Sequence, residues 1–127
     1  MKKMLPLFAL LAISSTVFAA DEMNPKFNCH RVPVIPDAGM GVTVLEGGIF
    51  FHTAVKVQNF FLGHSTSDNY LVRDIPSADG VAYEDSATQG QELSLNINQE
   101  ARLKDGGYPA QLRLKNQKVS LSCTDAN

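Results

Sequence analysis

Apolar and polar residues alternate in short runs along most of the chain after residue 26. In the segments 93–97 and 119–123, every second residue is apolar and the residues between them are polar. Successive side chains of a β-strand point to opposite faces, so this alternation predicts half-buried antiparallel strands. The expected strands cover residues 27–34, 41–46, 49–59, 69–75, 81–84, 92–98, 109–115 and 118–123.

Two short segments are predicted to be the turns of hairpins. Gly47 and Gly48 suit a two-residue loop, because glycine adopts the positive φ that such turns require. A loop centred on this pair places Val44 opposite Phe51 and matches the faces of both strands.

The second expected hairpin turn lies near the C-terminus. Asn116 and Gln117 separate two alternating runs, and a turn at this pair places Leu112 opposite Leu121 on one buried face. Since turn residues and alternation give the same faces, both hairpins favour an antiparallel sheet.

Other segments have a weaker pattern. Asn98 is placed to cap one turn of helix over residues 99–104, but a continuation of the preceding strand fits the same residues. The segments 63–69 and 85–91 are polar and are expected to be loops.

The pattern predicts an all-β fold, either a small antiparallel β-sandwich or a β-barrel of about seven or eight strands, closed by one disulfide. Residues 20–127 form a single domain of ordinary size, in which residues 20–26 are expected to be a flexible tail. Leu95 and Leu121 are central in alternating runs and are therefore predicted to lie in the core.

Residues 1–19 have the order of features found in secretory signal peptides. Lys2 and Lys3 precede an apolar segment over residues 5–17, and Val17 and Ala19 supply side chains of small or modest size at the −3 and −1 positions of a cleavage site. The apolar segment is shorter than the roughly 20 residues that span a bilayer, and no later segment approaches that length. We therefore expect cleavage near Ala19 and a bacterial protein located in the periplasm or secreted, with no membrane insertion.

Charge and cysteine content narrow the class of protein. Without Lys2 and Lys3 the chain has 9 basic and 13 acidic residues, a net charge of −4, which disfavours binding to nucleic acid.

The only cysteines are Cys29 and Cys123, near opposite ends of the expected domain. In an oxidising compartment such a pair is expected to form a disulfide, and a pair of buried free thiols or a reactive thiol is the alternative.

Candidate chemistry is sparse. His30, His52 and His64 are not at the spacing that places two metal ligands on one face of a strand or helix, so no metal and no cofactor is expected. The sequence contains no motif for a catalytic nucleophile or for phosphate binding. We therefore expect a protein that is not an enzyme, although the sequence leaves an enzyme open as an alternative. The doublets Phe50–Phe51 and Phe60–Phe61 are expected to be covered on both faces of their strands, and the alternative is an exposed ring that forms a contact surface.

Residues 77–85 resemble the loop of small residues, glycine and tyrosine found in bacterial periplasmic inhibitors of C-type lysozyme. Those proteins are also small exported β-barrels with one cysteine in an early strand and another near the end. The resemblance implies a binding loop that carries Ser77, Asp79, Gly80 and Tyr83.

The function expected from these observations is non-catalytic binding of an unknown protein, a glycan or an envelope component, by a monomer. The alternatives are an inhibitor of C-type lysozyme and a small extracytoplasmic enzyme of unrecognised type.

Overall fold

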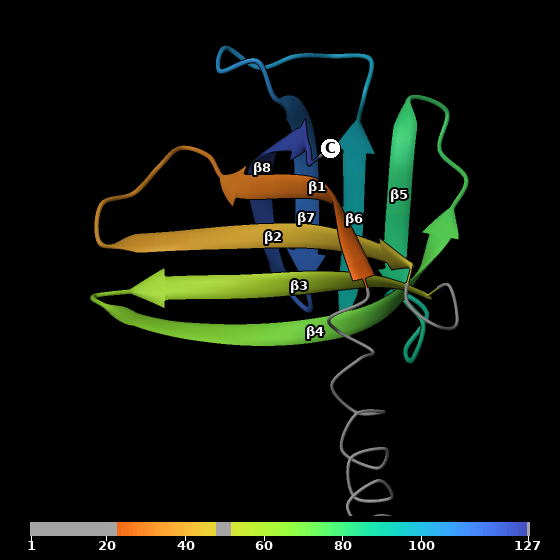
Figure 1. Cartoon of the computed structure of the whole chain (residues 1–127), viewed down its shortest axis with the longest axis horizontal. Coiled ribbons are helices and arrows are strands. Elements are labelled where there is room, and N and C mark those ends of the chain that lie inside the picture. The colour runs from red at the N-terminus through yellow and green to blue at the C-terminus, as the bar shows by residue number, and fades with distance from the viewer. Residues whose placement is uncertain (1–22, 48–51, 127) are drawn as a thin grey trace, which may run out of the picture.

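A computed structural model describes residues 23–47 and 52–126, which form eight antiparallel strands (Figure 1). The expected signal peptide, residues 1–19, lies outside the described residues. The strands are β1 (Met23–Arg31), β2 (Ala38–Gly47), β3 (His52–Phe61), β4 (His64–Ile75), β5 (Gly80–Asp85), β6 (Leu93–Asn98), β7 (Tyr108–Leu114) and β8 (Gln117–Asp125).

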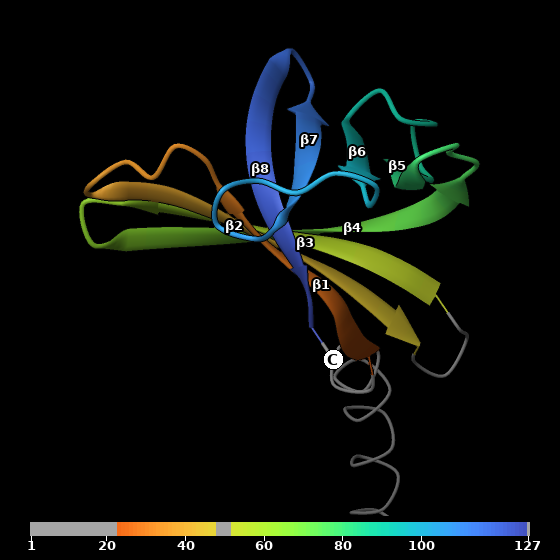
Figure 2. The same cartoon turned by 90° about the horizontal axis from the view of Figure 1, so that it is seen from above.

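Each strand pairs with the next, and β8 pairs with β1, so the sheet is a closed barrel. The all-β prediction is confirmed, and of the two expected architectures the barrel is present. Figures 1 and 2 show that β2, β3 and β4 extend well beyond the rest of the barrel at one end. The described residues include no helix long and apolar enough to span a membrane.

The interior of the barrel is filled by the apolar residues of the alternating runs. Leu95 and Leu121, predicted as core residues, are fully buried, together with Leu93 and Leu112. Their polar neighbours Asn96, Gln111 and Ser120 are exposed on the outer surface, as the alternation predicts for a sheet with one buried face.

A disulfide joins Cys29 to Cys123, as the sequence predicts. The two residues lie directly opposite each other where β1 pairs with β8. The bond therefore links the first and last strands at the point where the barrel closes.

The hairpin formed by β2 and β3 differs from the expected one. Val44 lies opposite Val55 and Gly47 opposite His52, so the expected pairing of Val44 with Phe51 is wrong by four residues. A shift by an even number preserves the inward and outward faces, so alternation alone does not distinguish the two registers.

The hairpin formed by β7 and β8 is also shifted from the expected register. Leu112 pairs with Val119, two residues from the expected partner Leu121. The turn lies at Lys115 and Asn116, one residue earlier than predicted, and Lys115 adopts a positive φ of 53°. The strand faces again agree with the prediction.

Three segments have a different conformation from the one expected. Residues 23–26 are not a tail but the start of β1, where Lys26 forms an ion pair with Glu46 of β2 at 3.0 Å. Residues 64–69 are not a loop but the first half of β4, because they pair continuously with β3. Residues 99–104 are neither helix nor strand, because the Asn98 side chain accepts a hydrogen bond from the N–H of Glu100 and closes a turn.

The loop between β5 and β6 is organised by one buried carboxylate. Asp85 is 3% exposed, and one of its oxygens accepts hydrogen bonds from the N–H groups of Gly90, Glu92 and Leu93 at 3.0–3.2 Å. The other accepts from the N–H and the hydroxyl of Thr88 at 2.7 and 2.5 Å. Burial raises the pKa of this carboxyl, but the hydrogen bonds outweigh it and lower the pKa to about 2.

The projecting end of β2, β3 and β4 carries exposed apolar side chains. Phe60 is 46% exposed, and Phe61 and Leu62 are each 62% exposed. The expectation that Phe60 and Phe61 are covered on both faces is therefore wrong, and Phe50 and Phe51 lie outside the described residues. The strands continue past the rim of the barrel at this point, so neither face has the packed interior behind it.

Candidate functional site

Polar side chains form a row across the outer face of three neighbouring strands. Asn96 of β6 lies opposite Gln111 of β7, which lies opposite Ser120 of β8. All three residues are exposed. Since they are the polar members of alternating runs, the packing that buries the inner residues of each strand also fixes this row in place.

The segment between β6 and β7 forms one wall beside this row. Asp105 accepts hydrogen bonds from the Gly107 N–H and the Ser122 hydroxyl, each at 2.9 Å, and these bonds lower its pKa. A Cβ on Gly107 would lie 2.0 Å from the hydroxyl oxygen of Ser122, so the segment approaches β8 more closely than a side chain permits. This contact places Leu103 at the edge of the row.

The opposite wall is formed by the residues that precede β5. The Ser77 hydroxyl donates a hydrogen bond to the Asp79 carboxylate at 3.1 Å, and the Asp79 carbonyl accepts one from the Gln99 N–H at 2.9 Å. A Cβ on Gly80 would lie 1.9 Å from the carbonyl oxygen of Ile97, so only glycine allows β5 to start this close to β6.

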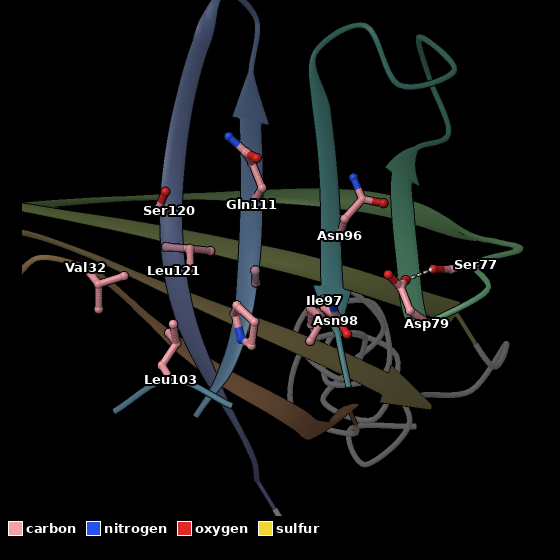
Figure 3. Close-up of a pocket in the computed structure, with 12 residues that line it drawn as sticks. Val32, Ser77, Asp79, Asn96, Ile97, Asn98, Leu103, Gln111, Ser120 and Leu121 are labelled. Atoms are coloured by element: carbon pink, nitrogen blue, oxygen red, sulfur yellow. Dashed lines mark hydrogen bonds between the residues drawn. The ribbon is translucent and has the colours of Figure 1, made fainter. Parts of the chain in front are cut away.

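Together these walls and the row enclose a groove of about 570 Å³. Figure 3 shows Asn96 and Gln111 projecting from neighbouring strands, with the Ser77–Asp79 pair on one side and Val32 and Leu103 on the other. The residues that line the groove are Val32, Ser77, Asp79, Asn96, Ile97, Asn98, Leu103, Pro109, Ala110, Gln111, Ser120 and Leu121.

The side chains of the groove are suited to hydrogen bonding. Three carboxamides, from Asn96, Asn98 and Gln111, each offer both donors and acceptors, and the hydroxyl of Ser120 does the same. Asp79 is the only ionisable residue among those that line the groove, so the pair of acid–base groups that hydrolysis of a glycosidic bond uses is not present there. The groove therefore offers hydrogen-bond donors and acceptors together with a single carboxylate.

The four residues of the expected binding loop lie in different environments. Ser77 and Asp79 are exposed and line the groove. Gly80 begins β5 and packs against β6. Tyr83 is 2% exposed and lies in the core of the barrel, and burial raises the pKa of its hydroxyl, with the carboxylates of Asp74 and Glu46 adding to the effect.

The three histidines are separated along the sheet. His30 lies in β1 near Asp105, with 3.5 Å between the Nε2 atom and a carboxylate oxygen. His52 and His64 begin β3 and β4. Within residues 23–47 and 52–126, no three His, Cys, Asp or Glu side chains are grouped so as to hold a metal ion.

The residues at the centre of the groove are not among those predicted from the sequence to form a site. Asn96, Gln111 and Ser120 appear in the sequence only as polar positions between buried ones, and the signal that unites them is the pairing of β6, β7 and β8. Comparison with protein family models, curated proteins and solved structures gave no match.

Proposed function

We propose that this protein is an exported, non-catalytic binding domain that holds a glycan of the cell envelope in the groove on β6, β7 and β8. The observation that carries the proposal is the row formed by Asn96, Gln111 and Ser120 on adjacent strands. Carboxamides and hydroxyls pair well with sugar hydroxyls and N-acetyl groups, because each of these groups can both donate and accept hydrogen bonds.

The charge and the apolar atoms of the groove support a neutral sugar ligand. Asp79 contributes one negative charge at one side, and the remaining side chains that line the groove are uncharged. The apolar atoms of Val32, Leu103 and Pro109 offer contacts for the carbon faces of a sugar ring. The disulfide is compatible with the oxidising compartment in which such a ligand is found.

The test is isothermal titration calorimetry of the mature protein with soluble oligomers of N-acetylglucosamine. We expect saturable binding that Gln111→Ala weakens about fivefold or more, since about two neutral hydrogen bonds are lost. Gln58→Ala is the matched control, because Gln58 lies on β3 and is not among the residues that line the groove. The proposal is wrong if Gln111→Ala and Gln58→Ala bind the oligomers equally well.

Inhibition of C-type lysozyme is a second candidate, supported by the exposed Ser77–Asp79 turn at the groove. Tyr83 is buried, so its hydroxyl is not available to an enzyme at the surface. Insertion of Asp79 between the carboxylates of the enzyme would place like charges together in a desolvated cleft. We expect no strong inhibition in a cell-wall lysis assay, and potent inhibition that Ser77→Ala abolishes would favour this candidate instead.

A further inference from the structure

The outer edge of β4 is paired along only part of its length. β3 pairs with β4 from His64 to Val72, whereas β5 pairs only with Val72–Ile75. Among the described residues, no strand pairs with the outer edge of residues 64–70. Figure 1 shows this part of β4 at the margin of the projecting sheet, with the β3–β4 turn at its tip.

The backbone groups at this edge have a defined direction. The Ser86 N–H donates a hydrogen bond to the carbonyl of Leu71 at 2.9 Å, so the backbone of Leu71 faces the β5 side of the strand. Backbone groups of an antiparallel strand alternate in direction from one residue to the next. Ser65, Ser67 and Asn69 therefore direct both their N–H and their C=O groups outward from the open edge.

The open edge lacks the features that usually protect a strand from pairing. Residues 64–70 contain no proline and no lysine, and the register with β3 runs without a bulge. All of these residues except Tyr70 are exposed. An exposed, unpaired edge of this kind can accept another strand.

We infer that the open edge of β4 pairs with the same edge of a second copy of this chain, so that the protein is a symmetric dimer. An antiparallel pairing about Ser67 places Ser65 of one copy opposite Asn69 of the other. All three outward-facing residues then form hydrogen-bonded pairs, with about six backbone hydrogen bonds between the copies.

The side chains on this edge are compatible with self-pairing in that register. Thr66 lies opposite Asp68 of the second copy, so that its hydroxyl can donate to the carboxylate, and His64 lies opposite Tyr70. No residue of the edge lies directly opposite a residue of the same charge. Cross-strand pairs of this kind stabilise a sheet, whereas like charges in opposite positions destabilise it.

The same register gives the exposed side chain of Leu62 a site in the second copy. Pairing about Ser67 ends at Ser65 opposite Asn69, because Ser86 already occupies the position beside Leu71. The turn at Gly63 of one copy then lies next to this position in the other copy. Leu71, Ser86 and Ala87 line a hollow of about 520 Å³ at this place. The neighbouring Leu62, which is 62% exposed, is then positioned to fill the hollow in the second copy. This dimer differs from the monomer expected from the sequence.

The first test is sedimentation equilibrium of the mature protein with edge variants. Ser67→Pro removes an outward N–H and leaves the pairing with β3 intact, since proline is tolerated on an edge whose N–H faces solvent. We expect dimer for the natural protein and for Ser67→Ala, and monomer for Ser67→Pro. A natural protein that stays monomeric at about 1 mM, or a dimer that Ser67→Pro leaves intact, overturns the inference.

The register is tested by oxidative cross-linking of single cysteine variants, with the native disulfide checked by peptide mapping. Ser67→Cys places the two new thiols opposite each other, at a Cα separation of about 5.5 Å that suits a disulfide. In Ser65→Cys the two thiols are about 13 Å apart across the axis, so this variant is the matched control. We expect a cross-linked dimer for Ser67→Cys and none for Ser65→Cys, and equal cross-linking overturns the register.

The role of the tip is tested separately by Leu62→Asn. Asparagine tolerates the positive φ of 50° at this residue and removes the apolar side chain. We expect dimer dissociation to become at least about tenfold more favourable, because an apolar contact is lost in both halves of the interface. Val34→Asn is the control, since this exposed residue lies in the β1–β2 loop and not beside the open edge. An equal effect of both variants contradicts the proposed contact.

Discussion

Replacement of Asp85 by asparagine tests whether one carboxylate holds the loop between β5 and β6. Five hydrogen bonds converge on this side chain, from the backbone N–H groups of Thr88, Gly90, Glu92 and Leu93 and from the Thr88 hydroxyl. An asparagine retains one carbonyl oxygen, but its NH₂ group faces a backbone N–H donor. We expect the free energy of unfolding at pH 7 to fall by about 2–3 kcal/mol, since an unsatisfied buried donor costs about 1–3 kcal/mol and a charge-assisted bond is lost as well.

The same carboxylate predicts a defined dependence of stability on pH. Its pKa is lowered from 3.8 to about 2 in the folded protein, so its contribution is fully present above about pH 4. The contribution is lost progressively as the pH falls through about 2. The full difference in pKa corresponds to at most about 2.4 kcal/mol.

Urea unfolding followed by far-ultraviolet circular dichroism between pH 2 and pH 7 measures both effects. Glu92→Gln is the matched control, because it removes a charge from the same loop, and only its backbone N–H bonds to Asp85. We expect Glu92→Gln to change stability by about 0.5 kcal/mol or less. If Asp85→Asn has the same small effect, or loses stability in acid as steeply as the natural protein, the reasoning about this carboxylate is refuted.

Two further predictions concern the barrel itself. Leu95→Ala is expected to lower the free energy of unfolding by about 2–5 kcal/mol, because it opens a cavity in the core. Ser94→Ala on the outer face should change this free energy by about 0.5 kcal/mol or less. Urea unfolding measures both variants. Replacing both Cys29 and Cys123 by serine should cost about 2–5 kcal/mol, because the disulfide closes a loop with a sequence separation of 94 residues, and a thermal melt without reductant checks this.

The strand faces could be predicted from the sequence, but the pairing of the strands could not. Alternation has a period of two residues, so a shift of two or four residues leaves every side chain on its face. At the last hairpin the sequence favours a turn at Asn116, but the turn begins at Lys115 with a positive φ. The expected register would place Gln111 opposite Ser122 instead of Ser120, so the groove could not be assembled from the sequence.

The first half of β4 was not predicted because its residues are polar on both faces. Residues 64–69 project beyond the barrel, where no core selects apolar residues at alternate positions. Their strand conformation comes from hydrogen bonds to β3 and not from burial. The role of Asp85 in holding the loop between β5 and β6 could not be predicted for a related reason. Four of the five donors that bond to its carboxylate are backbone N–H groups, which no sequence pattern distinguishes.

The groove and the open edge of β4 lie on different strands, so one surface can be occupied while the other is in use. A dimer formed through β4 carries two grooves, because no groove residue belongs to that strand. Two linked sites bind a repeating surface more tightly than either site alone, by a factor that reaches about 10²–10⁴ when both can engage. We therefore expect Ser67→Pro to reduce retention on insoluble cell-wall glycan by at least about tenfold, and to leave the affinity for a short soluble oligomer unchanged. Equal losses in both assays would mean that the substitution damages the groove itself, and no loss in either would mean that the two grooves do not act together.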